Sequence, residues 1–177
     1  VNGNGKGEAE ETFDSDKYKD FGFRLNQAVG EIASVGGFFY YGKEKGLEEP
    51  LLEQNESAAN EVTYYGPDVN VEAGPLTFTG QYLFRKDTNP FFREDGEEVQ
   101  TNGWIAELIV APHKDRSRLY FTGLYNQVDS ELDSFDYETL TGMGTYLLSR
   151  NLRLNLEYTR DLLWDQNRFV AGLVTAF

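Results

Sequence analysis

The chain has 177 residues with a net charge of −14, from 16 Lys and Arg against 30 Asp and Glu, and this negative field disfavours nucleic-acid binding. It contains no cysteine, which excludes disulfides, zinc–thiolate sites and cysteine nucleophiles. No stretch approaches the roughly 18 to 20 consecutive apolar residues of a membrane-spanning helix.

Apolar and polar side chains alternate along most of the chain, which predicts strands with one apolar and one polar face. In chain order, the predicted strands are 20–27, 32–43, 61–73, 76–85, 102–111, 118–128, 139–149, 152–162 and 168–177. The alternation is clearest in 20–27, 76–85 and 152–162. The sequence therefore predicts an all-β protein of about nine strands, each roughly ten residues long, the length that crosses a bilayer when tilted near 45°.

The predicted connections alternate in length. Short connections are expected at 28–31, 73–75, 111–117 and 149–151. Long ones, rich in Asp, Glu, Asn, Gly and Pro, are expected at 44–60, 86–101 and 129–138. Short turns at one end and long polar loops at the other favour an antiparallel up-and-down transmembrane β-barrel. A soluble β-sandwich or lipocalin-like barrel is the alternative, although neither needs long loops at one end only.

Aromatic residues near the ends of the predicted strands fit this interpretation, because Tyr and Trp gather at membrane interfaces. They are Tyr18, Phe38 to Tyr41, Tyr64, Tyr65, Trp104, Tyr125 and Trp164. Ordinary packing explains any single one of them equally well.

The final strand carries the most specific motif. Phe169, Ala171, Leu173, Thr175 and Phe177 fall on one face of it. This strand resembles the C-terminal signature of bacterial outer-membrane β-barrels, and 146–177 resembles the last hairpins of porin-like barrels, including phosphate-selective porins and the sheaths of porin–cytochrome conduits. The resemblance implies that the barrel-assembly machinery recognises these residues. It also implies a place in the outer membrane of a Gram-negative bacterium, in contact with lipid and lipopolysaccharide.

Two regions follow from this interpretation. Residues 1–17 read as an outer loop or a trimmed N-terminus, and residues 18–177 as barrel strands with long acidic extracellular loops. An odd number of strands would leave the N-terminal residues on the outer side, whereas complete bacterial barrels have even counts. The chain is therefore expected to be the C-terminal part of a larger barrel that other strands or subunits complete. The alternative is a small closed barrel with an even number of strands, in which case the pattern has predicted one strand too few or too many.

The polar side chains of the regular strands predict what the sheet encloses. An Arg or Lys that faces lipid at the bilayer midplane costs about 2 to 4 kcal/mol, so these residues should face a lumen. The predicted pore-lining residues are Arg24, Asn26, Thr77, Thr79, Gln81, Arg85, Glu107, Arg153, Asn155 and Glu157. Most are expected to form cross-strand pairs, and Arg24 and Arg85 are the better constriction candidates because Arg is long.

Little in the sequence points to catalysis or to a cofactor. The only histidine, His113, lies in a predicted turn, so neither a histidine metal site nor a serine triad is supported. Asp129, Glu131 and Asp133 are weak candidates for a hard cation, because such ions take oxygen ligands. A hydrated surface loop that meets lipopolysaccharide-bound cations is the simpler interpretation of that segment. The chain is expected not to be an enzyme.

Three functions remain. The first is an outer-membrane channel for passive diffusion of small hydrophilic solutes, with acidic loops that concentrate cations at its mouth. The second is a structural sheath around a partner such as a multihaem cytochrome; with no cysteine for covalent attachment, any haem would belong to the partner. The third is a soluble β-binding module.

Overall fold

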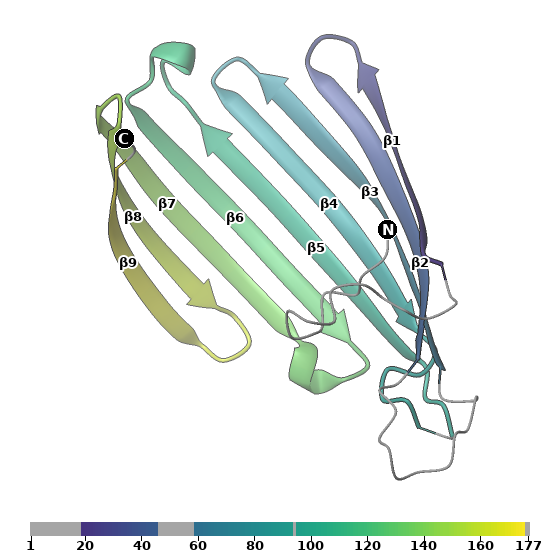
Figure 1. The fold of residues 1–177 in the computed structure, drawn as a ribbon. Coiled ribbons are helices and arrows are strands. Elements are labelled where there is room, and N and C mark those ends of the chain that lie inside the picture. The colour runs from purple at the N-terminus through teal and green to yellow at the C-terminus, as the bar shows by residue number, and fades with distance from the viewer. Residues whose placement is uncertain (1–18, 46–58, 94, 176–177) are drawn as a thin grey trace.

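The computed structural model describes residues 19–45, 59–93 and 95–175, which form a single sheet of nine strands in sequence order (Figure 1). The strands are β1 (Phe21–Val29), β2 (Ala33–Lys45), β3 (Ala59–Ala73), β4 (Leu76–Asp87), β5 (Val99–Val110), β6 (Leu119–Ser130), β7 (Tyr137–Ser149), β8 (Leu152–Asp161) and β9 (Gln166–Thr175). Two short 3₁₀ turns, η1 (Lys114–Arg116) and η2 (Asp133–Phe135), are the only helical elements of this part of the chain. None of the described helices has the length and apolar character needed to span a membrane.

Every neighbouring pair of strands is antiparallel, so the predicted up-and-down meander of nine strands is confirmed. The strand boundaries lie within a few residues of those expected. The largest difference is at β5, which begins at Val99 rather than at 102. Val99 already pairs with Asp87 of β4, and the Glu131 carboxylate accepts a hydrogen bond from the Gln100 amide at 2.7 Å. These contacts extend the strand into a segment that the sequence assigned to a loop.

The connections alternate in length only in part (Figure 1). The β5–β6 connection, 111–118, was expected to be short, but it is longer than 131–136 and 162–165 at the opposite end. At the end that we call the short-turn end, Gly30 and Gly74 adopt φ values of +66° and +64°, which L-residues with a side chain rarely reach. The opposite end, the long-connection end, carries 88–98 and 131–136 as well as the shorter turn 162–165. Most of the predicted loop 44–60 lies outside the described residues, as do Tyr18 and the predicted region 1–17.

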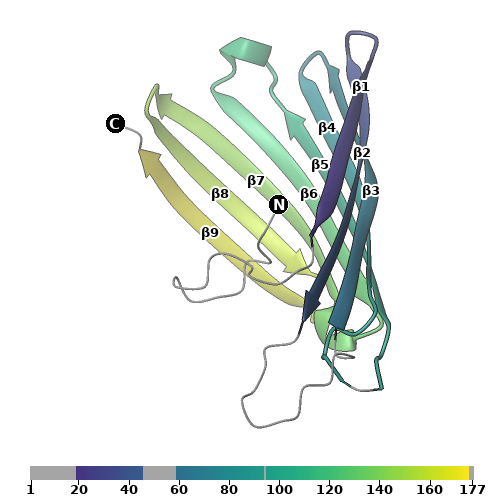
Figure 2. The ribbon, with the colours of Figure 1, turned by 45° about the vertical axis from the view of Figure 1, so that its right-hand side comes forward.

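The described sheet is curved and open (Figure 2). Its edges are β1, which pairs with β2, and β9, which pairs with β8. These two strands run in the same direction, so the antiparallel ladder that joins all the other strands cannot form between them. The architecture is therefore an open antiparallel sheet, and the closed transmembrane barrel stays a prediction.

The register places apolar and polar side chains on opposite faces. Phe23, Phe39, Tyr65 and Phe84 follow one another across β1 to β4, and we call the face that carries them the apolar face. It continues with Tyr82, Trp104, Ala106, Leu108, Phe121, Gly123, Tyr125, Leu140, Tyr146, Leu154, Leu156, Tyr158, Phe169, Ala171 and Leu173. The opposite face, which carries the residues between these, is called the polar face.

The polar face is the concave one. Along β6, Leu119, Phe121 and Gly123 of the apolar face are exposed, whereas Tyr120 and Thr122 of the polar face are half-buried. A curved sheet crowds the side chains on its concave side and spreads those on its convex side. The exposure pattern therefore indicates that the apolar residues cover the convex surface.

Gly66 of β3 lies directly against the backbone of β4. A Cβ atom added at Gly66 would lie 1.8 Å from the carbonyl oxygen of Tyr82 in β4. We expect Gly66→Ala to lower the free energy of unfolding by at least about 1–3 kcal/mol, the usual cost of overpacking, because backbone rather than a flexible side chain must move. Urea unfolding followed by tryptophan fluorescence measures this.

Gly123→Ala is the matched control, because nothing lies within 4 Å of a Cβ atom added there. Its effect should stay within about 0.5 kcal/mol, as for other substitutions in open space. Equal effects of the two substitutions would show that strand approach at Gly66 does not matter.

Candidate functional site

The apolar face exposes large side chains along its whole extent. Phe23, Phe78, Phe121, Leu156 and Leu173 are all exposed, although each is apolar. Monomeric soluble proteins rarely expose contiguous apolar patches larger than a few hundred Å². This face therefore needs an apolar environment, which lipid or another protein surface can supply.

At the long-connection end, the apolar face is bordered by tyrosines whose hydroxyl groups bind polar residues. Tyr125 donates to Glu138 Oε1 at 2.9 Å and Tyr158 to Asn167 Oδ1 at 2.7 Å, and Tyr82 donates to Asn102 Oδ1. The ring of Tyr82 also lies 4.5 Å from that of Trp104. Each such ring is apolar on its body and polar at its tip, which suits a boundary between apolar and aqueous surroundings.

Ion pairs lie at the same border. Lys43 Nζ is 2.7 Å from Glu61 Oε1, and Lys86 Nζ is 2.7 Å from Glu98 Oε1. The ammonium group of Lys86 holds the pKa of Glu98 below its ordinary value, because the lysine hydrogen bond favours the carboxylate. Charged residues thus begin where the aromatic residues end, and we call this border the polar rim.

Of the predicted interface aromatics, those on the apolar face, as the membrane interpretation requires, are Phe39, Tyr41, Tyr65, Trp104 and Tyr125. Phe38, Tyr40 and Tyr64 lie on the polar face instead, since they alternate with their neighbours. Trp164 lies in the β8–β9 turn and is exposed. The sequence pattern did not separate these groups, because β2 and β3 carry rings at consecutive positions.

All the predicted pore-lining residues share the polar face. They are Arg24 and Asn26 of β1, Thr77, Thr79, Gln81 and Arg85 of β4, Glu107 of β5, and Arg153, Asn155 and Glu157 of β8. Several strands are joined there by side chains. Arg24 Nη2 is 2.8 Å from Asp68 Oδ2, Thr145 donates to Asn155 at 3.0 Å, and Arg168 Nη2 is 3.2 Å from Glu157 Oε1.

The Arg24–Asp68 pair passes across β2, which lies between β1 and β3. Asn26 and Asp68 are the register partners of Gly36 on either side. A Cβ atom at Gly36 would lie only 2.8 Å from Asp68 Oδ1, so the absence of a side chain there makes room for the carboxylate. Both predicted constriction arginines have acidic partners, because Arg85 pairs with Asp87.

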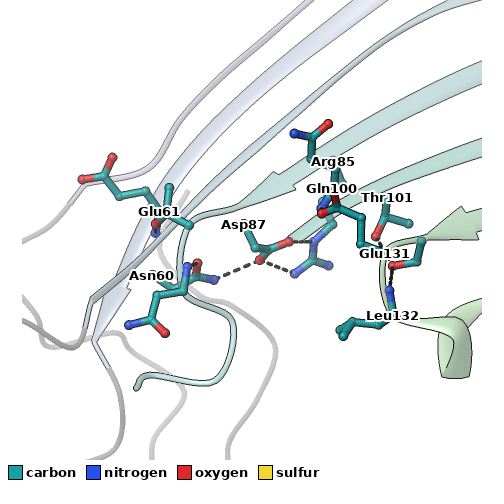
Figure 3. A network of polar contacts seen from close by, with 11 residues as sticks. Asn60, Glu61, Arg85, Asp87, Gln100, Thr101, Glu131 and Leu132 are labelled. Atoms are coloured by element: carbon teal, nitrogen blue, oxygen red, sulfur yellow. Dashed lines mark hydrogen bonds and ion pairs between the residues drawn. The ribbon is translucent and has the colours of Figure 1, made fainter. Parts of the chain in front are cut away.

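A buried polar network, which the sequence did not predict, fixes the ends of β3 and β4 (Figure 3). Asn60 is 1% exposed, and its Nδ2 donates to Asp87 Oδ1 at 2.9 Å while its Oδ1 accepts from the Asn89 amide at 2.9 Å. Arg85 Nη2 donates to Asp87 Oδ1 at 2.8 Å. The only sequence signal is the run of Asp87 and Asn89 after a strand, which indicates a turn rather than a buried cluster.

From this network, polar and aromatic contacts continue across the polar face. The Arg85 guanidinium carbon lies 5.0 Å from the centre of the Tyr64 ring, which in turn lies 5.7 Å from that of Tyr40. Tyr40 donates to Asp20 Oδ2 at 2.8 Å. Beyond Asp87, Thr101 and Ser130 join β5 to β6, with Glu131 beside them (Figure 3). These contacts link Asp20, just before β1, to β2, β3 and β4, and a second set links β5 to β6.

Some residues of the polar face are apolar and exposed. Ile105 is 41% exposed, Val170 43% and Val174 38%. They sit on β5 and β9, where the alternation is weaker because both parities carry apolar residues. The concave surface is therefore mixed in character rather than wholly polar.

The predicted barrel-assembly residues and the predicted cation ligands have different outcomes. Phe169, Ala171, Leu173 and Thr175 lie together on the apolar face of edge strand β9, and Phe177 lies outside the described residues. Asp129, Glu131 and Asp133 are not brought together, since the described residues contain no group of three acids or histidines able to hold a metal ion. Instead, Glu131 binds the Gln100 amide.

Comparison of the chain with protein-family models and with curated proteins gives no match. A function is therefore inferred from the sheet, its two faces and its polar rim.

Proposed function

We propose that this sheet forms part of the wall of a β-barrel in the outer membrane of a Gram-negative bacterium, and that the barrel is a porin-like channel for passive diffusion of small hydrophilic solutes. The observation that carries the proposal is the combination of an exposed, convex apolar face with a concave face on which all the predicted lumen residues lie. Lipid would cover the first surface and water would fill the space behind the second.

The polar rim supports the same orientation. Tyr82, Tyr125 and Tyr158 turn their hydroxyl groups toward polar partners at one border of the apolar face, where the lipid headgroups would lie. The long connections would then face the cell exterior and contact lipopolysaccharide, and the short turns would face the periplasm. In this proposal, the barrel-assembly machinery would recognise the apolar residues of β9.

Planar-bilayer recording of the purified protein tests the channel. We expect stable open-channel steps that the same protein, unfolded before addition, does not produce. The excess of acidic residues, 30 against 16 basic ones, should make the channel favour cations and argues against simple selectivity for phosphate. A protein that enters vesicles and shows no conductance would exclude a passive channel.

A structural sheath is the second candidate, and the exposed apolar residues of the polar face favour it. Ile105 and Val170 would be covered if another protein, such as a multihaem cytochrome, occupied the lumen. Purification from the native membrane distinguishes the two functions. A sheath should yield a non-conducting complex with a haem-containing partner, whereas a channel should conduct alone.

A further inference from the structure

We propose that Glu107 is the residue that sets the cation preference of the channel. This inference rests on the proposed function and replaces the expectation, drawn from side-chain length, that Arg24 and Arg85 act at the constriction. The reason is that most charged side chains in the middle of the polar face form ion pairs, whereas Glu107 forms none with a described residue.

The arginines of the central and outer polar face have acidic partners. Arg24 pairs with Asp68, Arg85 with Asp87, and Arg168 with Glu157. A paired charge presents a passing ion with a dipole rather than with a net charge, and the field of a dipole falls off more steeply with distance. These arginines should therefore exert little net preference for anions.

Glu107 differs from these residues. Among the described residues, no hydrogen bond or ion pair engages its carboxylate, and its nearest neighbours across the polar face are Thr79 of β4 and Leu124 of β6. Ile105 and Ile109 precede and follow it on the same face of β5. The carboxylate thus lies half-buried among neutral side chains, so its full charge acts on the space above the sheet.

The position of Glu107 along β5 also favours an effect on permeating ions. Its immediate neighbours Ala106 and Leu108 belong to the middle of the apolar face, between Trp104 at the polar rim and Val110 at the strand end. Glu107 would therefore lie near the bilayer midplane, where every permeating ion must pass.

The remaining charges of the described polar face lie near its ends. Glu72 is the next-to-last residue of β3 and Arg153 the second of β8, and they have opposite signs. Asp161 ends β8 and accepts hydrogen bonds from the amides of Leu163 and Trp164. Glu107 is thus the one uncompensated charge in the middle of the described wall.

Reversal potentials in a KCl gradient across a planar bilayer test the proposal. A unit charge about 8 Å from an ion changes each permeability about twofold, so Glu107→Gln should lower the ratio of K⁺ to Cl⁻ permeability by about two- to sixfold. Glu107→Asp should retain the wild-type ratio, and Glu107→Lys should lower it further. The difference between wild type and Glu107→Gln should shrink between about 0.1 M and 1 M KCl, where the Debye length falls from about 10 to 3 Å.

Glu98→Gln is the matched control, because it removes the same carboxylate from the polar rim of the convex apolar face, away from the concave surface that carries Glu107. Its permeability ratio should equal that of the wild type. Open-channel steps from Glu107→Gln with an unchanged ratio would overturn the role of Glu107 and leave the channel standing. Absence of steps from the wild-type protein would overturn the proposed function itself, and this inference with it.

Discussion

In the proposed orientation, replacement of Leu156 by Arg should lower the free energy of unfolding from a lipid bilayer by about 2–4 kcal/mol, the cost of a guanidinium that faces lipid near the midplane. Leu156 lies in the middle of the apolar face of β8, between Gly144 of β7 and Ala171 of β9. Both neighbours are small, so the longer side chain fits sterically and only its charge is penalised. Urea titration of the protein in phospholipid vesicles measures the change.

Val170→Arg is a closely matched control for this experiment. Val170 is 43% exposed and Leu156 45%, and they lie on adjacent strands, but Val170 belongs to the polar face, directly opposite Glu157. Both substitutions remove an apolar side chain of similar exposure and add the same charge. In the proposed orientation Val170→Arg should cost less than about 1 kcal/mol, as for an exposed surface charge. Equal costs would contradict the assignment of lipid to the apolar face.

Removal of the Asp87 carboxylate should have the second large effect. The Asp87 side chain is 4% exposed, and Asp87→Ala would leave Arg85 and the buried Asn60 without their shared partner. Breaking a buried ion pair costs about 3–5 kcal/mol, and we expect the lower end, about 3 kcal/mol, because the Arg85 side chain is 39% exposed. Urea unfolding of the variant in detergent micelles measures the loss.

Arg160→Ala provides the comparison for Asp87→Ala, because it breaks the Arg160–Asp165 pair, whose side chains are 53% and 81% exposed. Exposed pairs contribute about 0–1 kcal/mol, so this variant should remain close to wild type in stability. If Asp87→Ala were no more damaging than Arg160→Ala, the network at the long-connection end would not be a structural clamp.

The strands and their faces could be predicted from the sequence because alternation is a local property. Leu154, Leu156 and Tyr158 differ from Arg153, Asn155 and Glu157 in polarity, and a strand places the two groups on opposite faces whatever its partners are. The same logic failed for Tyr40 and Tyr64, whose neighbours Tyr41 and Tyr65 are also aromatic. Where both parities carry rings, only the register decides which ring faces which side.

The polar network and the pairing of the arginines could not be predicted, because they depend on residues far apart in sequence. Asn60 meets Asp87 and Asn89 only once β3 has paired with β4, and Arg24 meets Asp68 only across the whole width of β2. Side-chain length suggested that Arg24 and Arg85 were available charges. The contacts show that both are paired. Within the described part of the chain Glu107 has no such partner, although the sequence placed it among the lumen residues without distinction.

The order of the strands in the meander determines how the sheet folds and unfolds. Each strand contacts the strands that precede and follow it in sequence, so the sheet is close to a one-dimensional array of hairpins. In such an array, stability is approximately a sum of terms for single strands and for adjacent pairs, and ordering can begin at any hairpin and spread outward. Local pairing of this kind also keeps contact order low for an all-β chain and so favours rapid pairing. Damage at one edge should remain near that edge, and β8 and β9 should pair whether or not β1 has found its place.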